Sequence, residues 1–259
     1  METIRIGSRG EAVKTLQRLL GIEPVDGVFG PITEKALKQY QKLNGLQDDG
    51  VAGPKTWALL EKEEIVIVDG HINTHITRSV NRPIKYIAIH YTAGSTSKKG
   101  TALSTKNVFL TRNASADFVV DDETIVQINP DLKNYYCWAV GDKKNTYSGG
   151  GSLYGKATNK NTISIEICSN LKKGTSAEMP NHAGWYFTER SLDNALKLVR
   201  YLMRKFNVPK SNVVRHYDIS GKLCPGIIGW NNSNVYDING KVTTKKSDSN
   251  AWMVFWSLI

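Results

Sequence analysis

Apolar residues along the chain follow two different spacings, which predict two regions of different fold. Over residues 1–63 they recur at helical spacing in three short segments, as in Val13, Leu16 and Leu20. Over residues 64–259 short β-branched runs alternate with longer helical patterns. We therefore predict a small all-α domain of three helices first, followed by an α/β domain with a mixed central sheet flanked by helices.

Five apolar runs predict the strands of the larger domain. They cover residues 84–89, 118–120, 124–128, 163–168 and 212–215. A long helix is expected from about Thr188 to Phe206, because apolar residues form an unbroken stripe at a period of 3.6. Glu166 stands out, since it interrupts an otherwise apolar strand, where a carboxylate is costly without a partner or a task.

The end of the chain divides into a polar and an apolar part. Residues 231–250 are rich in Asn, Ser and Lys, and we expect a long loop there. In residues 251–259 the side chains of Trp252, Phe255 and Ile259 share one helical face, which predicts a closing helix packed on the sheet. The alternative is a surface segment that contacts a cell wall or a membrane.

Composition narrows the class of protein. Of 259 residues, 40% are hydrophobic and 22% charged, as in ordinary soluble proteins. No apolar run approaches the roughly 18 residues of a membrane span. The first residues lack the basic and apolar pattern of a signal peptide, so we expect synthesis in the cytoplasm. The three cysteines are too few for a disulfide framework.

Charge is uneven between the two regions. Residues 1–64 hold 9 Lys+Arg against 10 Asp+Glu, whereas residues 65–259 hold 25 against 14. The larger region is therefore basic, with a net charge of +11, and would attract polyanions such as bacterial envelope polymers. The basic residues are scattered, so we do not expect nucleic-acid binding; a solvated basic face is the alternative.

An eight-residue motif occurs twice in the first region. Residues 26–33 (DGVFGPIT) recur as residues 49–56 (DGVAGPKT). Asp-Gly makes a tight turn and Gly-Pro starts a helix. Residues 4–62 resemble the peptidoglycan-binding domain type 1 family. The resemblance implies a module that binds bacterial peptidoglycan, without indicating which side chains contact it; a helical packing unit without a ligand is the alternative.

Two histidines and a cysteine form a candidate metal set in the second region. His90 and His216 each end a predicted strand, and Cys224 follows on a loop. Two imidazoles and a thiolate can bind zinc and leave a fourth position for water, which is the arrangement of catalytic zinc. The alternative is two histidines bonded to the backbone and an ordinary buried cysteine.

Four blocks in the second region resemble, in order, the N-acetylmuramoyl-L-alanine amidases of type 2. They are residues 87–94, 115–121, 161–166 and 215–225, and the resemblance runs from about residue 75 to 230. The family includes phage endolysins, bacterial autolysins and animal peptidoglycan recognition proteins. The resemblance implies a zinc hydrolase that cleaves the amide bond between N-acetylmuramic acid and L-alanine.

The resemblance also implies a role for each site residue. His90, His216 and Cys224 would bind one Zn²⁺. Glu166 would take a proton from the attacking water, and Lys222 would stabilise the oxyanion. A salt bridge is the alternative for Glu166, and an ordinary surface lysine is the alternative for Lys222.

One departure from the family bears on function. Many members carry a Trp-His pair near the site, whereas Trp138 is followed here by Ala139. A non-catalytic peptidoglycan receptor on the same fold is the competing function, and the presence of Cys224 disfavours it. We expect a monomer that reaches the cell wall after release by a holin, as phage endolysins do; a host autolysin is the alternative.

Overall fold

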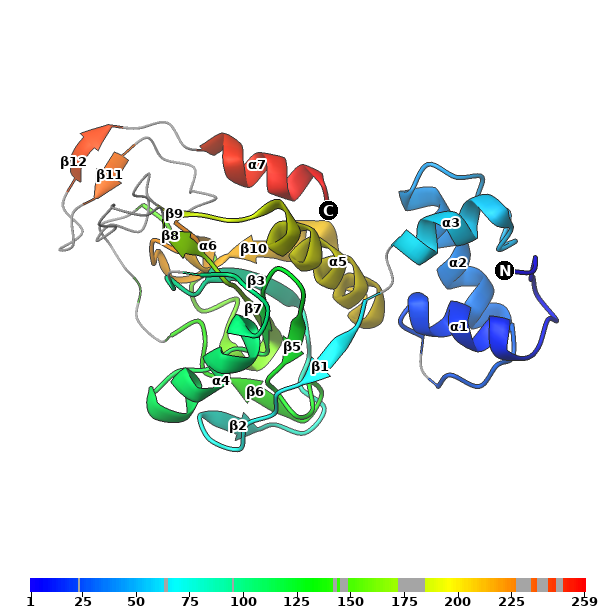
Figure 1. Cartoon of the computed structure of the whole chain (residues 1–259), viewed down its shortest axis with the longest axis horizontal. Coiled ribbons are helices and arrows are strands. Elements are labelled where there is room, and N and C mark those ends of the chain that lie inside the picture. The colour runs from blue at the N-terminus through cyan, green and yellow to red at the C-terminus, as the bar shows by residue number, and fades with distance from the viewer. Residues whose placement is uncertain are drawn as a thin grey trace. The chain divides into compact units, whose positions relative to one another are not determined.

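The computed structural model describes every residue except 23, 63–64, 95, 142–143, 145–148, 172–184, 227–233, 237–241 and 246–248. The chain divides into two compact units (Figure 1). Residues 1–65 with 200–207 form the first unit, and residues 66–199 with 208–259 form the second. The division falls two residues beyond the expected limit at residue 63, and the limits 1–63 and 64–259 stay predictions.

Three helices build the first unit, which confirms the all-α prediction. They are α1 (Glu11–Leu19), α2 (Pro31–Leu43) and α3 (Pro54–Lys62). The proline of each repeated motif is the first residue of a helix, where its missing N–H costs no hydrogen bond. The helices enclose an apolar core that includes Leu16, Leu37, Tyr40 and Trp57.

The first copy of the motif folds around a buried glutamine that lies outside it. The Nε2 of Gln17 donates to Asp26 Oδ1 at 2.7 Å, to the Val28 carbonyl at 3.1 Å and to Thr33 Oγ1 at 3.3 Å. Its Oε1 accepts the N–H of Gly27 at 2.9 Å. We call this arrangement a glutamine clasp.

The second copy repeats the clasp around Gln41. Its Nε2 donates to Asp49 Oδ1 at 2.9 Å, to the Val51 carbonyl at 3.0 Å and to Thr56 Oγ1 at 3.3 Å. Its Oε1 accepts the N–H of Gly50 at 3.0 Å. The polar groups of the motif therefore form hydrogen bonds that fix the turn to the preceding helix.

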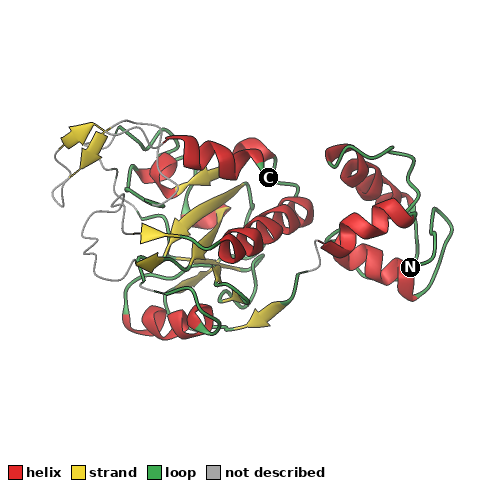
Figure 2. Cartoon of the chain, turned by 45° about the horizontal axis from the view of Figure 1, so that its top comes forward, coloured by secondary structure: helices red, strands yellow, loops and turns green. Residues whose placement is uncertain are grey.

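A six-stranded mixed sheet organises the second unit, which confirms the α/β prediction. Its order is β1-β5-β4-β7-β3-β10, and all neighbours are parallel except β4 and β5. The strands are β1 (Ile67–Asp69), β3 (Tyr86–Tyr91), β4 (Phe118–Val120), β5 (Ile125–Gln127), β7 (Thr162–Ile167) and β10 (Val213–Arg215). Helices α4 (Thr101–Thr111), α5 (Glu189–Phe206) and α6 (His216–Ser220) surround it (Figure 2).

Three two-stranded sheets accompany the main one, and two of them lie before the tail. Strand β2 (Ile76–Arg78) pairs antiparallel with β6 (Tyr135–Cys137), and β8 (Asn170–Leu171) pairs antiparallel with β9 (Trp185–Tyr186). No helix among the described residues is long and apolar enough to cross a membrane.

A buried ion pair between Arg82 and Asp117 links segments that are distant in the sequence. Arg82 Nη2 lies 3.1 Å from Asp117 Oδ1, and both side chains are almost fully buried. The same carboxylate accepts the Asn129 amide at 2.6 Å and the Ser164 N–H at 2.8 Å. These bonds satisfy a buried charge that would otherwise be costly.

The tail differs in part from the prediction. The expected loop over residues 231–250 is wrong at two antiparallel strands, β11 (Asn234–Tyr236) and β12 (Val242–Lys245). Val, Tyr and Thr residues there favour strands within a polar stretch, which composition alone concealed. Helix α7 (Ser249–Ser257) follows, with Trp252 and Phe255 buried as expected, but it ends before the partly exposed Ile259, so the expected limits 251–259 are wrong.

We expect Gln41→Leu to destabilise the first unit by about 1–3 kcal/mol, because buried partners of the clasp lose their hydrogen bonds. Hydrogen exchange at the amides of Gly50 and α3 in the full chain should accelerate. Gln39→Leu is the control, since Gln39 is exposed on the same helix. Equal exchange in the two variants would show that the clasp contributes no stability.

Candidate metal centre

Parallel strands bring the two predicted histidines together. His90 is the fifth residue of β3, and His216 directly follows Arg215, which lies opposite Ile89. The two imidazole centroids are 4.5 Å apart. Both side chains are buried at the carboxyl ends of neighbouring strands. Strand β3 continues to Tyr91 and His216 begins α6, so each histidine lies one residue from the end of its strand rather than at the end that the sequence predicted.

Cys224 completes a compact set of donors. Its carbonyl accepts the N–H of Tyr217 at 2.9 Å, so the loop after α6 returns to the start of that helix. The ligand atoms of His90, His216 and Cys224 all lie within 4.8 Å of one another, and all three residues are buried. Two imidazoles and a thiol at this spacing suit a tetrahedral metal ion.

In and beside the donor set, three buried side-chain atoms have no hydrogen-bond partner among the residues that the structure describes. They are His90 Nε2, His216 Nδ1 and Glu166 Oε2. Buried polar groups are normally paired, so several unsatisfied atoms in one place indicate a missing ligand. The other nitrogen of His216, Nε2, lies 3.0 Å from the Val140 carbonyl, which leaves Nδ1 available to a metal. The residues present therefore fit a metal ion.

Burial keeps both imidazoles neutral. It lowers the pKa of His90 well below the usual 6.5, and the neighbouring His216 and Lys222 lower it further. Burial, followed by Lys222, lowers the pKa of His216 to about 3. A neutral imidazole is the form that binds a metal, so neither histidine must lose a proton at neutral pH.

Cys224 and Glu166 retain their protons in the metal-free protein. Burial raises the pKa of the Cys224 thiol to about 12, and the Glu166 carboxyl raises it further. Burial also raises the pKa of Glu166 to about 8, although Lys222 opposes this effect. A bound cation would favour the thiolate, so metal binding should release a proton from Cys224.

Glu166 and Lys222 both act on the donor set. Glu166 lies opposite His90 in the pairing of β3 with β7, and its Oε1 is 3.9 Å from His90 Nδ1. Lys222 is exposed, yet its charge acts on His90, His216 and Glu166. The structure therefore brings together all five predicted residues.

Two residues near the site escaped the sequence analysis. Val140 contributes only a backbone carbonyl, and Asn159 binds the segment that carries it. Val140 has no sequence signal because every residue offers a backbone carbonyl. Asn159 has none because its side chain binds backbone N–H groups that every residue except proline also offers.

Comparison with known families agrees with this geometry. The model for N-acetylmuramoyl-L-alanine amidase matches residues 80–227, more than half of the chain. The chain belongs to this amidase family. A model for peptidoglycan binding domains matches residues 9–60. Both predicted resemblances are confirmed, and the metal cluster and Glu166 lie within the amidase match.

Individual relatives match parts of the chain. The amidase CwlH of Bacillus subtilis is 34% identical over 142 residues, which is 54% of this chain and 46% of that relative. The zinc D-Ala-D-Ala carboxypeptidase of Streptomyces albus G is 42% identical over 62 residues, 21% of this chain and 24% of that protein. The chain thus spans about half or less of these curated relatives.

A solved structure also matches part of the chain. It is a mutant endolysin from Bacillus subtilis, with 29% identity and a TM-score of 0.45. The match covers 62% of this chain and 90% of that one.

Glu166 predicts a pH dependence of stability in the metal-free protein. Unfolded chains lose this proton near pH 4.5, whereas the folded protein holds it until about pH 8. Through this carboxyl the folded state binds more protons, so Glu166 makes the free energy of unfolding fall as pH rises. The lowered pKa values of His90 and His216 act in the opposite direction below about pH 6.5, so the effect of Glu166 stands alone between pH 6.5 and 8. Glu166→Gln should remove the fall in that interval.

The measurement is urea unfolding with chelator at several values between pH 4.5 and 8. Glu123→Gln serves as the control, because Glu123 is exposed and pairs with the exposed Lys99 at the surface. Parallel pH curves for wild type and Glu166→Gln would contradict the burial of a protonated Glu166.

Proposed function

We propose that this protein is a zinc-dependent N-acetylmuramoyl-L-alanine amidase. It hydrolyses the amide bond between the lactyl group of N-acetylmuramic acid and L-alanine in peptidoglycan. The buried donor set of His90, His216 and Cys224, with unsatisfied nitrogens beside the Glu166 carboxyl, is the observation that carries the proposal. Membership of the amidase family supports it.

Each site residue has a task in this reaction. His90, His216 and Cys224 would hold the zinc ion, whose chemistry when bound is to acidify water and polarise a carbonyl. Glu166 takes a proton from the attacking water and passes it to the departing amine of L-alanine. Lys222 places a positive charge where the oxyanion develops.

The products distinguish this reaction from other wall hydrolysis. With purified cell walls, we expect new amino groups of alanine to appear without new reducing sugar ends. Chelator or Cys224→Ser should abolish their release by removing the metal. Glu166→Gln should slow it by roughly 10²–10⁴-fold, because it removes the general base.

Glu123→Gln is the matched control and should retain the wild-type rate, since Glu123 is exposed and outside the donor set. Wall binding without any new ends would instead support the non-catalytic receptor. New reducing ends would contradict the amidase assignment.

We propose further that the first unit binds the wall through the second copy of its motif. A groove of about 500 Å³ lies beside this copy, and its lining includes Leu46, Gln47 and Lys55. Gln41 also lines it, but its side-chain amide already forms the hydrogen bonds of the clasp. Exposed Gln47 and Lys55 are therefore better placed to contact sugar amides and peptide carboxylates.

Lys55→Glu should weaken retention of the full chain on insoluble walls by roughly threefold, the effect of one exposed charge pair. Sedimentation with walls measures it, in a Glu166→Gln background that limits cleavage. Lys35→Glu provides a charge-matched control on α2, where Lys35 is exposed. Equal losses in both variants would assign the effect to net charge rather than to this groove.

The proposed activity requires that the protein reach the bacterial cell wall. The protein would act on the bacterial cell wall as a monomer. Release from the cytoplasm through a holin stays a prediction.

A further inference from the structure

The His216 imidazole is held by a backbone carbonyl. Its Nε2 lies 3.0 Å from the carbonyl oxygen of Val140, in a buried contact. A carbonyl can only accept a hydrogen bond, so the proton of the neutral ring must reside on Nε2. Nδ1 then carries the lone pair, and it faces no hydrogen-bond partner among the described residues. The Val140 carbonyl thus selects the tautomer that suits a metal.

The position of this carbonyl depends on Asn159. The Oδ1 of Asn159 accepts the N–H of Ala139 at 3.0 Å and that of Val140 at 2.9 Å. Two bonds to successive amides fix both the place and the direction of the segment. Gly141 follows with φ of 67°, a left-handed conformation in which the chain turns directly after Val140.

Asn159 is itself held on its far side. It begins a short 3₁₀ turn, in which Asn161 Oδ1 accepts the N–H of Thr158 at 2.8 Å. Its backbone carbonyl is 3.3 Å from Nη1 of Arg82, the partner of Asp117 in the buried ion pair. These bonds connect the turn that bears the Asn159 side chain to the buried Arg82–Asp117 pair.

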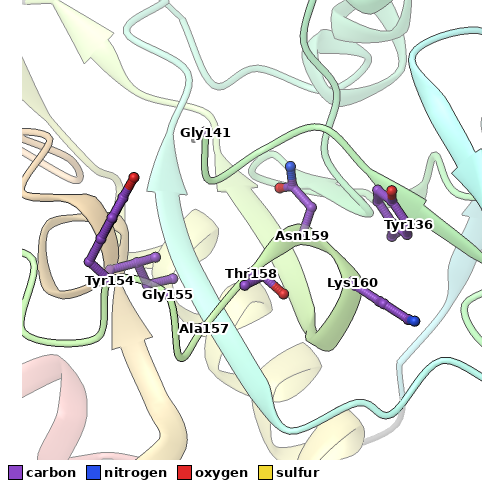
Figure 3. A pocket seen from close by; sticks show the side chains of 9 residues that line it. Tyr136, Gly141, Tyr154, Gly155, Ala157, Thr158, Asn159 and Lys160 are labelled. Atoms are coloured by element: carbon purple, nitrogen blue, oxygen red, sulfur yellow. The ribbon is translucent and has the colours of Figure 1, made fainter. Parts of the chain in front are cut away.

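Figure 3 shows Asn159 on the turn at residues 158–160, in the wall of a pocket that Gly141 also lines. The pocket has a volume of about 320 Å³, and Tyr136, Tyr154 and Lys160 also line it. None of the metal donors does. Among the described residues, the side chain of Asn159 makes no hydrogen bond to a donor atom or to Glu166, and its bonds lead to His216 through the Val140 segment.

We infer that Asn159 is a positioning residue for the metal centre. Through the Val140 carbonyl it fixes the orientation and tautomer of His216. The inference rests on the proposed function, because it assumes that His216 Nδ1 is a metal ligand. Partners of a ligating histidine commonly change metal affinity by 10–100-fold when they are lost.

The side chain chemistry gives a sharp test. Asn159→Leu has a similar size but no acceptor for the two N–H groups. Asn159→Asp keeps an acceptor oxygen at the same position. Lys160→Ala changes the same pocket wall without touching the link to His216, so it is the matched control.

Zinc affinity of the full chain, measured by competition with a chelating dye, is the first readout. We expect Asn159→Leu to bind zinc roughly tenfold more weakly, at the lower end of the range for such partners. Asn159→Asp and Lys160→Ala should stay within about twofold of wild type. Affinity in Asn159→Leu equal to wild type would overturn the inference and leave the proposed amidase intact.

The tautomer of His216 is the second readout, from ¹⁵N NMR of the imidazoles in metal-free protein. Wild type should carry the proton on Nε2, and Asn159→Leu should show a mixture. A merely structural role would lower the thermal stability of Asn159→Leu and leave both readouts unchanged, which would overturn the inference. A wild-type proton on Nδ1 would overturn it without any variant.

If Asn159→Leu does not fold, Asn159→Ser carries the same test, since its hydroxyl is too short to reach both N–H groups. Absence of zinc binding by wild type would overturn the proposed function together with this inference. The two failures are thus distinguishable.

Discussion

The parallel pairing of β3 with a neighbour on each side places His90, Glu166 and His216 of the candidate metal centre. On one side β7 puts Glu166 opposite His90, and on the other β10 ends one residue before His216. Successive side chains of a strand point to opposite faces, so a slip of one residue in either pairing would turn a site residue away. The short strands of this sheet therefore need strong constraints on their register.

Buried polar contacts supply those constraints. The Arg82–Asp117 pair joins the start of β4, strand β7 and the turn that bears Asn159. A buried ion pair contributes little net stability against an apolar replacement, but its hydrogen bonds define one arrangement. The glutamine clasps do the same in the first unit. In both units the interior polar groups specify geometry, while apolar burial provides the stability.

The centre itself is built at a cost to the fold. Neutral imidazoles, a protonated thiol and a protonated carboxyl are buried together, and several of their polar atoms lack partners. These unsatisfied groups destabilise the metal-free protein, and a bound cation would compensate them.

Local pattern determined a large part of this protein. Helical and strand periodicity predicted the three-helix unit, the main strands and α5, and ordered motifs pointed to the candidate site residues His90, Glu166, His216, Lys222 and Cys224. Only the tertiary structure decided the clasps, the buried ion pair and the link from Asn159 to His216. Periodicity and turn signals act between near neighbours, whereas these hydrogen bonds join side chains to backbone groups up to 80 positions away. Any residue can offer such a carbonyl or N–H, so the sequence carries no mark of which one is used.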